Sequence, residues 1–457
     1  MRILHAIHDF LPRHRAGSEI YAFELARELS ASADVFILAA EYDPGVPHGT
    51  IRWRPYQGIP VAEIVNNWQF GHFRETYSSE RINAQLRHVL DATQPDVLHV
   101  HNLLNLSFDL PRIAKERGIA TVATLHDYTL VCPSGGQRVH VAESHVCESI
   151  DPERCARCFS QSPLSSQMGA ARLTGGVASR AIARAGRAVF HLAPALAATL
   201  IKPLNAPGIA AGDIRRRLAA ARQVFESIDL CVAPSRSVAD EFCRLGFSRD
   251  RLHVSDYGFR GSAQPVRRVR AQDQPLRIGF VGTLVWHKGV HVLLEAARQL
   301  RGAFDVHIYG DPDVFPQYFA TLRTAAGPQV VFKGAFDRER VDDVYGTLDV
   351  LVVSSLWPEN SPLVIHEAFM HHVPVVAARV GGIPELVLDG ESGLLYDAFD
   401  AESLRASLQR LIDDRVLLER LSDHSPAVKS IAQDAREWQE RYRTLLTSRR
   451  PEVCAWT

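Results

Sequence analysis

The fold is decided at Trp357-Pro358-Glu359-Asn360-Ser361-Pro362-Leu363-Val364-Ile365-His366-Glu367-Ala368. This stretch follows the apolar, β-branched run Val350–Val353, which predicts a buried strand of a parallel sheet. Ser361 is a good N-cap residue, and Pro362 at the first helical position loses nothing by lacking an N–H. We therefore expect a strand–loop–helix junction of an α/β sheet.

The start of this helix predicts an anion site. The N–H groups of Leu363, Val364 and Ile365 should be free at the positive end of the helix dipole, which suits a phosphate. Glu367 lies four residues after Leu363 and so on the same helix face, while Glu359 lies in the loop in front. Two carboxylates beside a phosphate site indicate a sugar joined to a nucleoside diphosphate.

Composition sets broad limits on the class of protein. A chain of 457 residues should form about two or three domains. The net charge of −1 gives no indication of a nucleic-acid partner, and none is expected. Residues 1–7 resemble a first strand rather than a signal peptide, and no apolar run is long enough to span a membrane. Seven cysteines, an odd number, do not suggest a disulfide framework, so we expect a cytoplasmic protein.

Strand and helix patterns alternate in two blocks, which predicts two facing Rossmann-like domains. The first block is residues 1–260, with an insert at about 131–220 that breaks the alternation. A polar, basic linker candidate leads to the second block, residues 275–430. Residues 431–457 contain a final helix that this layout allows to return to the first domain. Ligands of such a fold bind in the cleft at the carboxyl ends of the strands.

Glycines and a lysine form the second half of the expected site. Gly282 and Thr283 end the first strand of the second domain, and Gly282 lets the backbone approach a ligand. Lys288 supplies a positive charge where a diphosphate leaves. Considered alone, Lys288 would be interpreted as a surface lysine beside a turn glycine. Because Glu359 and Glu367 are expected at the same sheet edge, we prefer the interpretation that Lys288 binds the diphosphate.

The first domain offers weaker candidates at its own carboxyl strand ends. Gly17 follows the first strand, with Ser18 as the expected N-cap, and could present its N–H to the diphosphate, although a plain turn residue is the alternative. His126 follows the strand at residues 120–125 and could bond a sugar hydroxyl or an acceptor. Asp127 would orient His126 or, alternatively, cap the following turn. His101 has a similar but weaker position.

These residues resemble the retaining nucleotide-sugar glycosyltransferases of the GT-B fold, specifically family 4, in a subgroup with a four-cysteine insert. Singly the motifs are weak, but their order and spacing are specific. They are Ala16-Gly17-Ser18-Glu19, residues 95–102, His126-Asp127, residues 279–282, residues 287–290, Glu359 to Glu367 as Glu-x7-Glu, residues 381–385 and residues 393–396.

The resemblance implies a role for each matching residue. Glu367 would bind the ribose, and Glu359 with the backbone from Asn360 through Ser361, Pro362, Leu363 and Val364 would hold the sugar and phosphates. Lys288 would neutralise the leaving diphosphate, Gly17 would contact it from the other domain, and His126 would contact the sugar. No metal or other cofactor is expected for the transfer. Many relatives carry an arginine where this chain has Thr283, so the diphosphate would depend on Lys288, the helix start or a basic group from elsewhere.

No nucleophile facing the anomeric carbon is evident in the sequence. We therefore expect attack by the acceptor on the face that the diphosphate leaves, with the donor phosphate as the base. The alternatives are a nucleotide-sugar epimerase or phosphorylase of the same fold, and a non-catalytic protein that binds sugar nucleotides. The presence together of Glu359, Glu367, Lys288 and His126 argues against the non-catalytic alternative.

Four cysteines lie in the insert with the spacing C-x14-C-x7-C-x2-C: Cys132, Cys147, Cys155 and Cys158. The C-x2-C pair presents two thiolates to one ion, and four thiolates suit structural zinc. Unconnected buried thiols are the alternative, an iron–sulfur centre is a minor one, and a redox pair is less favoured.

Nine basic residues and one acid lie between Arg172 and Arg222, around the apolar stretch 188–201. This stretch is too short to span a bilayer, but it suits peripheral contact with an anionic membrane at its inner face. A helical insert packed on the first domain is equally compatible. Membrane contact would favour a polyprenyl-linked or other lipid-linked acceptor over a free glycan, consistent with cell-surface polysaccharide assembly.

Overall fold

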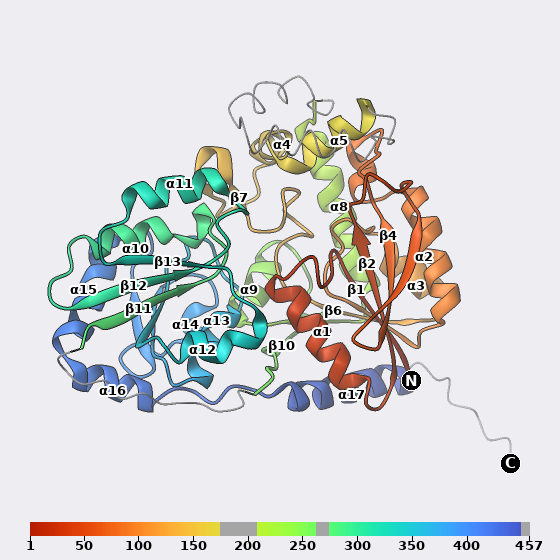
Figure 1. Cartoon of the computed structure of the whole chain (residues 1–457). Coiled ribbons are helices and arrows are strands. Elements are labelled where there is room, and N and C mark those ends of the chain that lie inside the picture. The colour runs from red at the N-terminus through yellow and green to blue at the C-terminus, as the bar shows by residue number, and fades with distance from the viewer. Residues whose placement is uncertain (174–207, 262–273, 449–457) are drawn as a thin grey trace, which may run out of the picture.

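The computed structural model describes residues 1–173, 208–261 and 274–448, which form two α/β domains side by side (Figure 1). The linker candidate and the apolar stretch 188–201 therefore lie largely or wholly outside the described residues. The predicted class is confirmed, because each domain is built on a mainly parallel sheet with helices on both faces.

The first domain has an eight-stranded sheet in the order β10-β9-β6-β5-β1-β2-β4-β3, in which β3 alone is antiparallel to its neighbour. Its strands are β1 (Arg2–Ile7), β2 (Asp34–Glu41), β3 (Ile51–Tyr56), β4 (Ile59–Val65), β5 (Val97–Val100), β6 (Ala120–Thr124), β9 (Leu230–Ala233) and β10 (Leu252–Val254). Its helices are α1 (Gly17–Leu29), η1 (Phe73–Thr76), α2 (Glu80–Thr93), α3 (Leu110–Glu116), α8 (Ala211–Ser227), α9 (Arg236–Arg244) and η4 (Arg249–Arg251).

The insert between β6 and α8 begins with a small hairpin and two helices. These are β7 (Val139–His140), η2 (Val141–Glu143), β8 (His145–Val146), α4 (Pro152–Ser160) and α5 (Pro163–Leu173). Asp151 caps α4 by accepting from the N–H groups of Glu153 and Arg154. Helix α4 packs on α8, so the described part of the insert is attached to the first domain.

The second domain has a six-stranded parallel sheet in the order β13-β12-β11-β14-β15-β16. Its strands are β11 (Leu276–Val281), β12 (Phe304–Tyr309), β13 (Val330–Gly334), β14 (Val350–Val353), β15 (Val375–Ala378) and β16 (Gly393–Tyr396). Its helices are η5 (Trp286–Lys288), α10 (Val290–Ala297), α11 (Pro316–Ala325), η6 (Arg338–Arg340), α12 (Val341–Tyr345), α13 (Leu363–Met370), α14 (Ile383–Leu386), α15 (Ala401–Asp413) and α16 (Arg415–Asp423).

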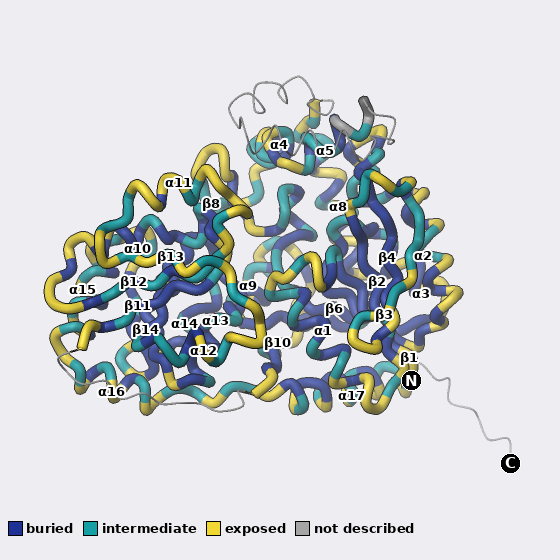
Figure 2. The backbone as a smooth tube through the Cα atoms, viewed as in Figure 1, coloured by how far each residue is buried: buried dark blue, intermediate teal, exposed yellow. Residues whose placement is uncertain are grey.

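The central strands are buried on both faces, as the dark tube through both sheets shows (Figure 2). Every residue of β5, β6, β14 and β15 is buried. This explains why β14 and β15 are continuous apolar runs rather than alternating ones, whereas β5 and β6 are mainly apolar and also bury His99, Thr121 and Thr124. Because the strands of each parallel array run in one direction, their carboxyl ends share one edge, and the loops at those edges supply the candidate site.

The last helix, α17 (Ile431–Ser448), returns from the second domain and packs on α1 of the first (Figure 1). Its buried Trp438 donates to the hydroxyl of Tyr21 at 3.1 Å, and Tyr21 donates to Asp434 at 2.8 Å. Gly258 lies so close to this helix that an added Cβ would stand 2.5 Å from Cβ of Asp434. The chain leaves the first domain in the segment after β10 and returns to it at the start of α17. These two segments therefore pack against each other.

Candidate active site between the two domains

Helix α13 begins one residue later than the sequence predicts, at Leu363, with Pro362 in the N-cap position and no side-chain cap. The prediction that Ser361 caps the helix is wrong. Its hydroxyl instead donates to Asp256 of the segment after β10, at 2.6 Å, and lies 2.9 Å from Nε2 of His366. The Ser361 hydroxyl therefore bonds a carboxylate from the other side of the cleft rather than an N–H group at the start of α13.

The start of α13 still offers N–H groups to an anion. Ile365 donates to the carbonyl of Pro362 at 3.0 Å, so its N–H is not free as predicted. Within the described ranges, the N–H groups of Leu363 and Val364 have no protein acceptor. Two donors at the positive end of an eight-residue helix therefore remain for a ligand.

Gly17 of the first domain lies directly against this helix start. An added Cβ at Gly17 would stand 3.1 Å from Cδ1 of Leu363, so the two domains approach each other here. Gly17 is the first residue of α1, whose N-cap position is held by Ala16 without a side-chain bond. The prediction that Ser18 caps α1 is therefore wrong, because its hydroxyl bonds the carboxylate of Glu19 at 2.9 Å.

Lys288 and Glu359 come together as an ion pair. The Nζ of Lys288 lies 2.5 Å from Oε1 of Glu359, and the same oxygen accepts from the hydroxyl of Ser355 at 2.5 Å. Glu359 is buried, Lys288 is half-buried, and its ammonium lies 5.5 Å from the ring centre of Trp357. The positive charge is thus held next to the loop that leads into α13.

Glu367 is buried and also paired, in this case by residues that the sequence did not indicate. Arg338 of η6 forms an ion pair with one carboxylate oxygen, and the hydroxyl of Tyr345 donates to the other at 2.9 Å. Arg338 therefore pairs with the carboxylate expected at the ribose, and it is not at the position of the arginine that Thr283 replaces. Thr283 is exposed, and Gly282 before it has a φ of +153° with its N–H donating to the carbonyl of Tyr309 at 3.0 Å.

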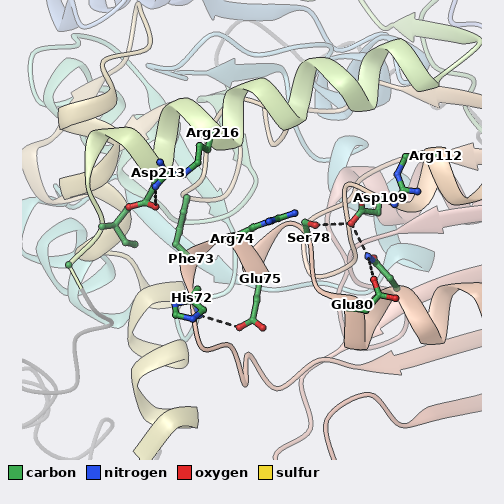
Figure 3. Close-up of a pocket in the computed structure, with 13 residues that line it drawn as sticks. His72, Phe73, Arg74, Glu75, Ser78, Glu80, Asp109, Arg112, Asp213 and Arg216 are labelled. Carbon is green, nitrogen blue, oxygen red and sulfur yellow. Dashed lines mark hydrogen bonds and ion pairs between the residues drawn. The ribbon is translucent and has the colours of Figure 1, made fainter.

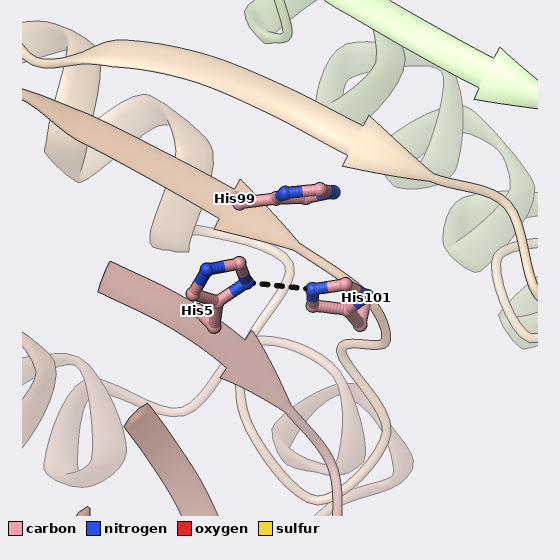
Figure 4. A group of neighbouring side chains, drawn as sticks. All are labelled: His5, His99 and His101. Carbon is pink, nitrogen blue, oxygen red and sulfur yellow. Dashed lines mark hydrogen bonds between the residues drawn. The ribbon is translucent and has the colours of Figure 1, made fainter. Parts of the chain in front are cut away.

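His126 belongs to a hydrogen-bonded column of imidazole rings. Its Nε2 lies 2.9 Å from Nδ1 of His101. The Nε2 of His101 in turn lies 2.9 Å from Nδ1 of His5, and Figure 4 marks this second contact with a dashed line. The other nitrogen of His126 lies 2.8 Å from the hydroxyl of Tyr257. Burial lowers the pKa of His126 from 6.5 to about 3 and that of His5 to about 3, so both rings are neutral. Both ring nitrogens of His126 already have protein partners, so a sugar contact through either would require an exchange.

Asp127 does not orient His126. Its Oδ1 accepts from the N–H of Thr129 at 2.7 Å, and its Oδ2 accepts from the amide of Asn102 at 2.8 Å. The alternative prediction, a cap of the following turn, describes this arrangement. Burial raises the pKa of Asp127, partly offset by these hydrogen bonds.

Asn360 connects the two domains beside these residues. Its amide donates to the carbonyl of His126, while its Oδ1 is buried and has no hydrogen-bond partner in the described part of the chain. The carbonyl of Asn360 would lie 2.0 Å from a Cβ at Gly382, so that glycine permits the close packing of the loop. Further along, Glu385 accepts from the N–H groups of Arg236 and Ser237 at 2.8 and 2.7 Å, at the start of α9. The cleft is thus closed by contacts from several segments.

A further polar group near this edge was not predicted from the sequence: His8, Asp9 and Glu19. Nε2 of His8, after β1, lies 3.4 Å from Glu19 and 3.9 Å from Asp9. The only signal in the sequence is that His8 and Asp9 directly follow the first strand and that Glu19 lies at the start of the first helix. Ligand atoms of these three residues lie within 4.8 Å of one another, as do those of His5, His99 and His101.

The four insert cysteines are partly buried free thiols in one neighbourhood. Cys155 and Cys158 are three residues apart on α4. Burial, and then the neighbouring thiols Cys132, Cys147 and Cys158, raise the pKa of Cys155 to about 12. Among the described residues, however, the four sulfurs are not one of the groups whose ligand atoms lie within 4.8 Å of one another. Zinc binding would require these side chains to move closer and lose their protons.

No helix within the described ranges is long and apolar enough to cross a membrane. Four basic residues of the insert region lie on α8: Arg215, Arg216, Arg217 and Arg222. Arg217 is buried, and its guanidinium donates to the carbonyls of Leu130 and Thr129. That arginine therefore stabilises the packing of the first domain.

Comparison with known proteins gives matches in both domains. Residues 15–151 match the family described as Glycosyltransferase Family 4, and residues 275–414 match that described as Glycosyl transferases group 1. The lipopolysaccharide core biosynthesis glycosyltransferase LpsE of Rhizobium meliloti (strain 1021) is 29% identical over 233 residues, which cover 49% of this chain and 65% of LpsE. The amylovoran biosynthesis glycosyltransferase AmsK of Erwinia amylovora is 29% identical over 202 residues, 41% of this chain and 49% of AmsK. The matched stretches thus span about half to two-thirds of these relatives.

Solved structures match over nearly the whole chain at low identity. Sucrose-phosphate synthase (tll1590) from Thermosynechococcus elongatus superposes with a TM-score of 0.65 and 16% identity, covering 98% of this chain and all of that one. Anabaena Alr3699/HepE, solved in complex with UDP and glucose, gives a TM-score of 0.61 and 15% identity over 97% of this chain and 100% of its own. These likenesses establish the GT-B fold.

Proposed function

We propose that this chain, which has the GT-B fold and matches a glycosyltransferase family in each of its two domains, is a retaining glycosyltransferase. It would transfer a sugar from a nucleoside diphosphate donor to a glycan or lipid-linked acceptor in cell-surface polysaccharide biosynthesis. LpsE and AmsK, by their names, act in lipopolysaccharide core and amylovoran biosynthesis.

One observation carries the proposal: the start of α13, where unpaired N–H groups, Lys288 and the buried Glu359 and Glu367 meet beside Gly17 of the other domain. Negative charge develops on the diphosphate as its bond to the anomeric carbon breaks. Fixed N–H dipoles and a lysine at that position stabilise this charge, and they need no reorganisation during the reaction. The donor phosphate competes with Glu359 for Lys288, so donor binding rearranges that ion pair.

The remaining roles follow from position. Glu367, held by Tyr345 and Arg338, would accept hydrogen bonds from the ribose, and Glu359 would face the sugar. The acceptor would attack from the side of the first domain, on the face that the diphosphate leaves. His126 would support this side through its carbonyl bond with Asn360 and its ring column.

The test is donor hydrolysis by the full chain across a panel of UDP-, GDP- and ADP-sugars. We expect release of nucleoside diphosphate from at least one donor, with the released sugar keeping its anomeric configuration by NMR. A folded chain that hydrolyses and binds none of these donors would contradict the proposal, and an inverted product would contradict retention.

We also propose structural zinc at Cys132, Cys147, Cys155 and Cys158, on the strength of their spacing and common neighbourhood. Four thiolates around one ion would fix the loop after β6 to α4. Elemental analysis of the purified chain should give about one zinc per molecule, and about none in a Cys155→Ser/Cys158→Ser variant. Zinc-free wild-type protein that remains fully folded would overturn this proposal.

Peripheral contact with an anionic membrane is proposed from the basic, apolar sequence between Arg172 and Arg222. Co-sedimentation with phosphatidylglycerol vesicles should exceed that with phosphatidylcholine vesicles and should decrease with salt. Equal recovery with both vesicles would instead favour an insert that contacts only protein.

A further inference from the structure

A polar cavity of about 720 Å³ lies in the first domain, outside the site described above (Figure 3). It is lined by η1, the starts of α2 and α3, and the start of α8. Neighbouring strands in the series β4, β2, β1, β5 and β6 are all parallel. The loops that follow β4, β5 and β6 therefore lie at the same edge of the sheet. The cavity therefore opens at the same sheet edge as His126, which follows β6.

One loop connects the cavity to the cleft. Residues 101–109 follow β5, and His101 and Asn102 at its beginning contact His126 and Asp127. Asp109 at its end lines the cavity. This loop therefore links the first-domain side of the cleft, around His126, to the cavity.

Asn83 supplies the observation that points to a ligand. It lines the cavity, its side chain is only 3% exposed, and its Nδ2 donates to Oδ2 of Asp109 at 2.8 Å. This bond fixes which atom is the oxygen, and that Oδ1 has no hydrogen-bond partner among the described residues. A buried acceptor without a donor is costly unless water or a ligand supplies one.

The charges of the lining select against an anionic ligand. Three arginines face four carboxylates, and two of the pairs are Arg216 with Asp213 at 2.7 Å and Arg112 with Asp109 at 3.2 Å. Arg74 is exposed and makes no ion pair with any described residue. A hydroxyl both donates and accepts, so a ligand rich in hydroxyls matches alternating donors and acceptors better than a phosphate does.

We propose that this cavity binds a neutral, hydroxyl-rich part of the glycan acceptor, at a distance from the sugar unit that reacts. The inference rests on the proposed glycosyltransferase function and adds to it a second acceptor subsite in the first domain. It also gives the acceptor class: an oligosaccharide chain rather than a single sugar. Longer neutral acceptors should therefore bind more tightly than their truncated forms.

The experiment is binding of the labelled full chain, with UDP present, to a printed array of neutral bacterial surface oligosaccharides from disaccharides to longer repeats. We expect the longer oligosaccharides to bind. Asn83→Leu removes the unpartnered oxygen, and Arg74→Ala removes an exposed arginine with no ion pair; each should weaken that binding about fivefold, the loss expected for one hydrogen bond. His88→Ala is the matched control, because His88 is an exposed residue on the same helix as Asn83 and does not line the cavity.

Equal binding by the variants and the control, or no oligosaccharide bound by the wild type, would overturn the subsite. If Asn83→Leu does not fold, Arg74→Ala decides alone. Donor hydrolysis is measured in parallel and should be the same in all variants. Donor hydrolysis without glycan binding would contradict only the subsite, whereas glycan binding without any donor turnover would contradict only the proposed transferase.

Discussion

At the residue scale, Lys288 is the sharpest test of the chemistry. Its ammonium pairs with Glu359 at the place where the diphosphate would leave. Lys288→Ala should lower kcat by about 10²- to 10³-fold, the range for loss of one group that stabilises developing charge, and weaken donor binding far less. Single-turnover rates and titration with the donor identified in the panel measure the two effects separately.

Lys333→Ala is the control for that substitution, because Lys333 is an exposed lysine on β13 of the same domain. Its kcat should equal that of the wild type. An unchanged rate in Lys288→Ala would remove the lysine from the mechanism.

The positions of the candidate residues could be predicted from the sequence: Lys288, Glu359 and His126 lie in segments that follow strands, and Glu367 lies on the next helix. Their partners could not be predicted. Arg338 pairs with Glu367 from 29 residues away, in a segment without a recognisable pattern. Ser361 was expected to cap a helix, yet its hydroxyl donates to Asp256, which comes from the other domain. Such partners depend on how the domains meet, which local propensity does not contain.

At the element scale, the position of Lys288 depends on a single glycine. Gly289 ends η5 with a φ of +70°, and an added Cβ would stand 1.8 Å from the carbonyl oxygen of Ser354. Gly289→Ala must therefore move η5 away from the end of β14. We expect a loss of more than about 3 kcal/mol in the free energy of unfolding, with a matching loss of activity.

Gly334→Ala separates steric overlap from backbone strain. Gly334 has a similar φ of +75°, but no atom lies within 4 Å of its added Cβ. This control should cost only about 1 kcal/mol, the strain of a left-handed alanine. Urea unfolding of both variants makes the comparison, and equal losses would show that contact with Ser354 does not fix η5.

The central strands were predictable at this scale because strands buried on both faces are mostly apolar rather than alternating. The apolar runs at β14 and β15 and the mainly apolar stretches at β5 and β6 therefore predict the right elements. The short hairpin of β7 and β8 was not predicted, since two-residue strands leave no periodicity in the sequence. Its place beside the cysteines depends on tertiary contacts.

At the scale of the whole molecule, the chain crosses between domains twice, and the second crossing ends in α17 packed on α1. The hydroxyl of Tyr442 lies 2.7 Å from Nδ1 of His99, and the ring centre of Trp438 lies 4.3 Å from that of His99, so the last helix covers the histidines of the first sheet at His99. Sequence could suggest that a final helix returns, but not which surface it would cover. This covering is one reason that the histidines are buried.

The buried histidines give the first domain a predictable response to acid. Desolvation lowers the pKa of His5 and His126 from 6.5 to about 3 and lowers the pKa of His99 and His101 as well. The folded pKa values lie below those of the unfolded chain, so between about pH 6.5 and pH 3 the unfolded chain binds protons that the folded chain does not. The free energy of unfolding is therefore undiminished above this window and decreases as the pH falls through it.

At about pH 5 each such histidine should lower the free energy of unfolding by about 2 kcal/mol relative to about pH 7.5, although neighbouring rings do not contribute additively. Urea midpoints at the two pH values measure the effect. His5→Gln should make the dependence shallower, because glutamine cannot take up a proton and its amide can still bond Nε2 of His101, the present partner of His5. A wild-type midpoint that is equal or higher at the lower pH would contradict the neutral column, and an unchanged slope in His5→Gln would show that the acid sensitivity comes from other groups.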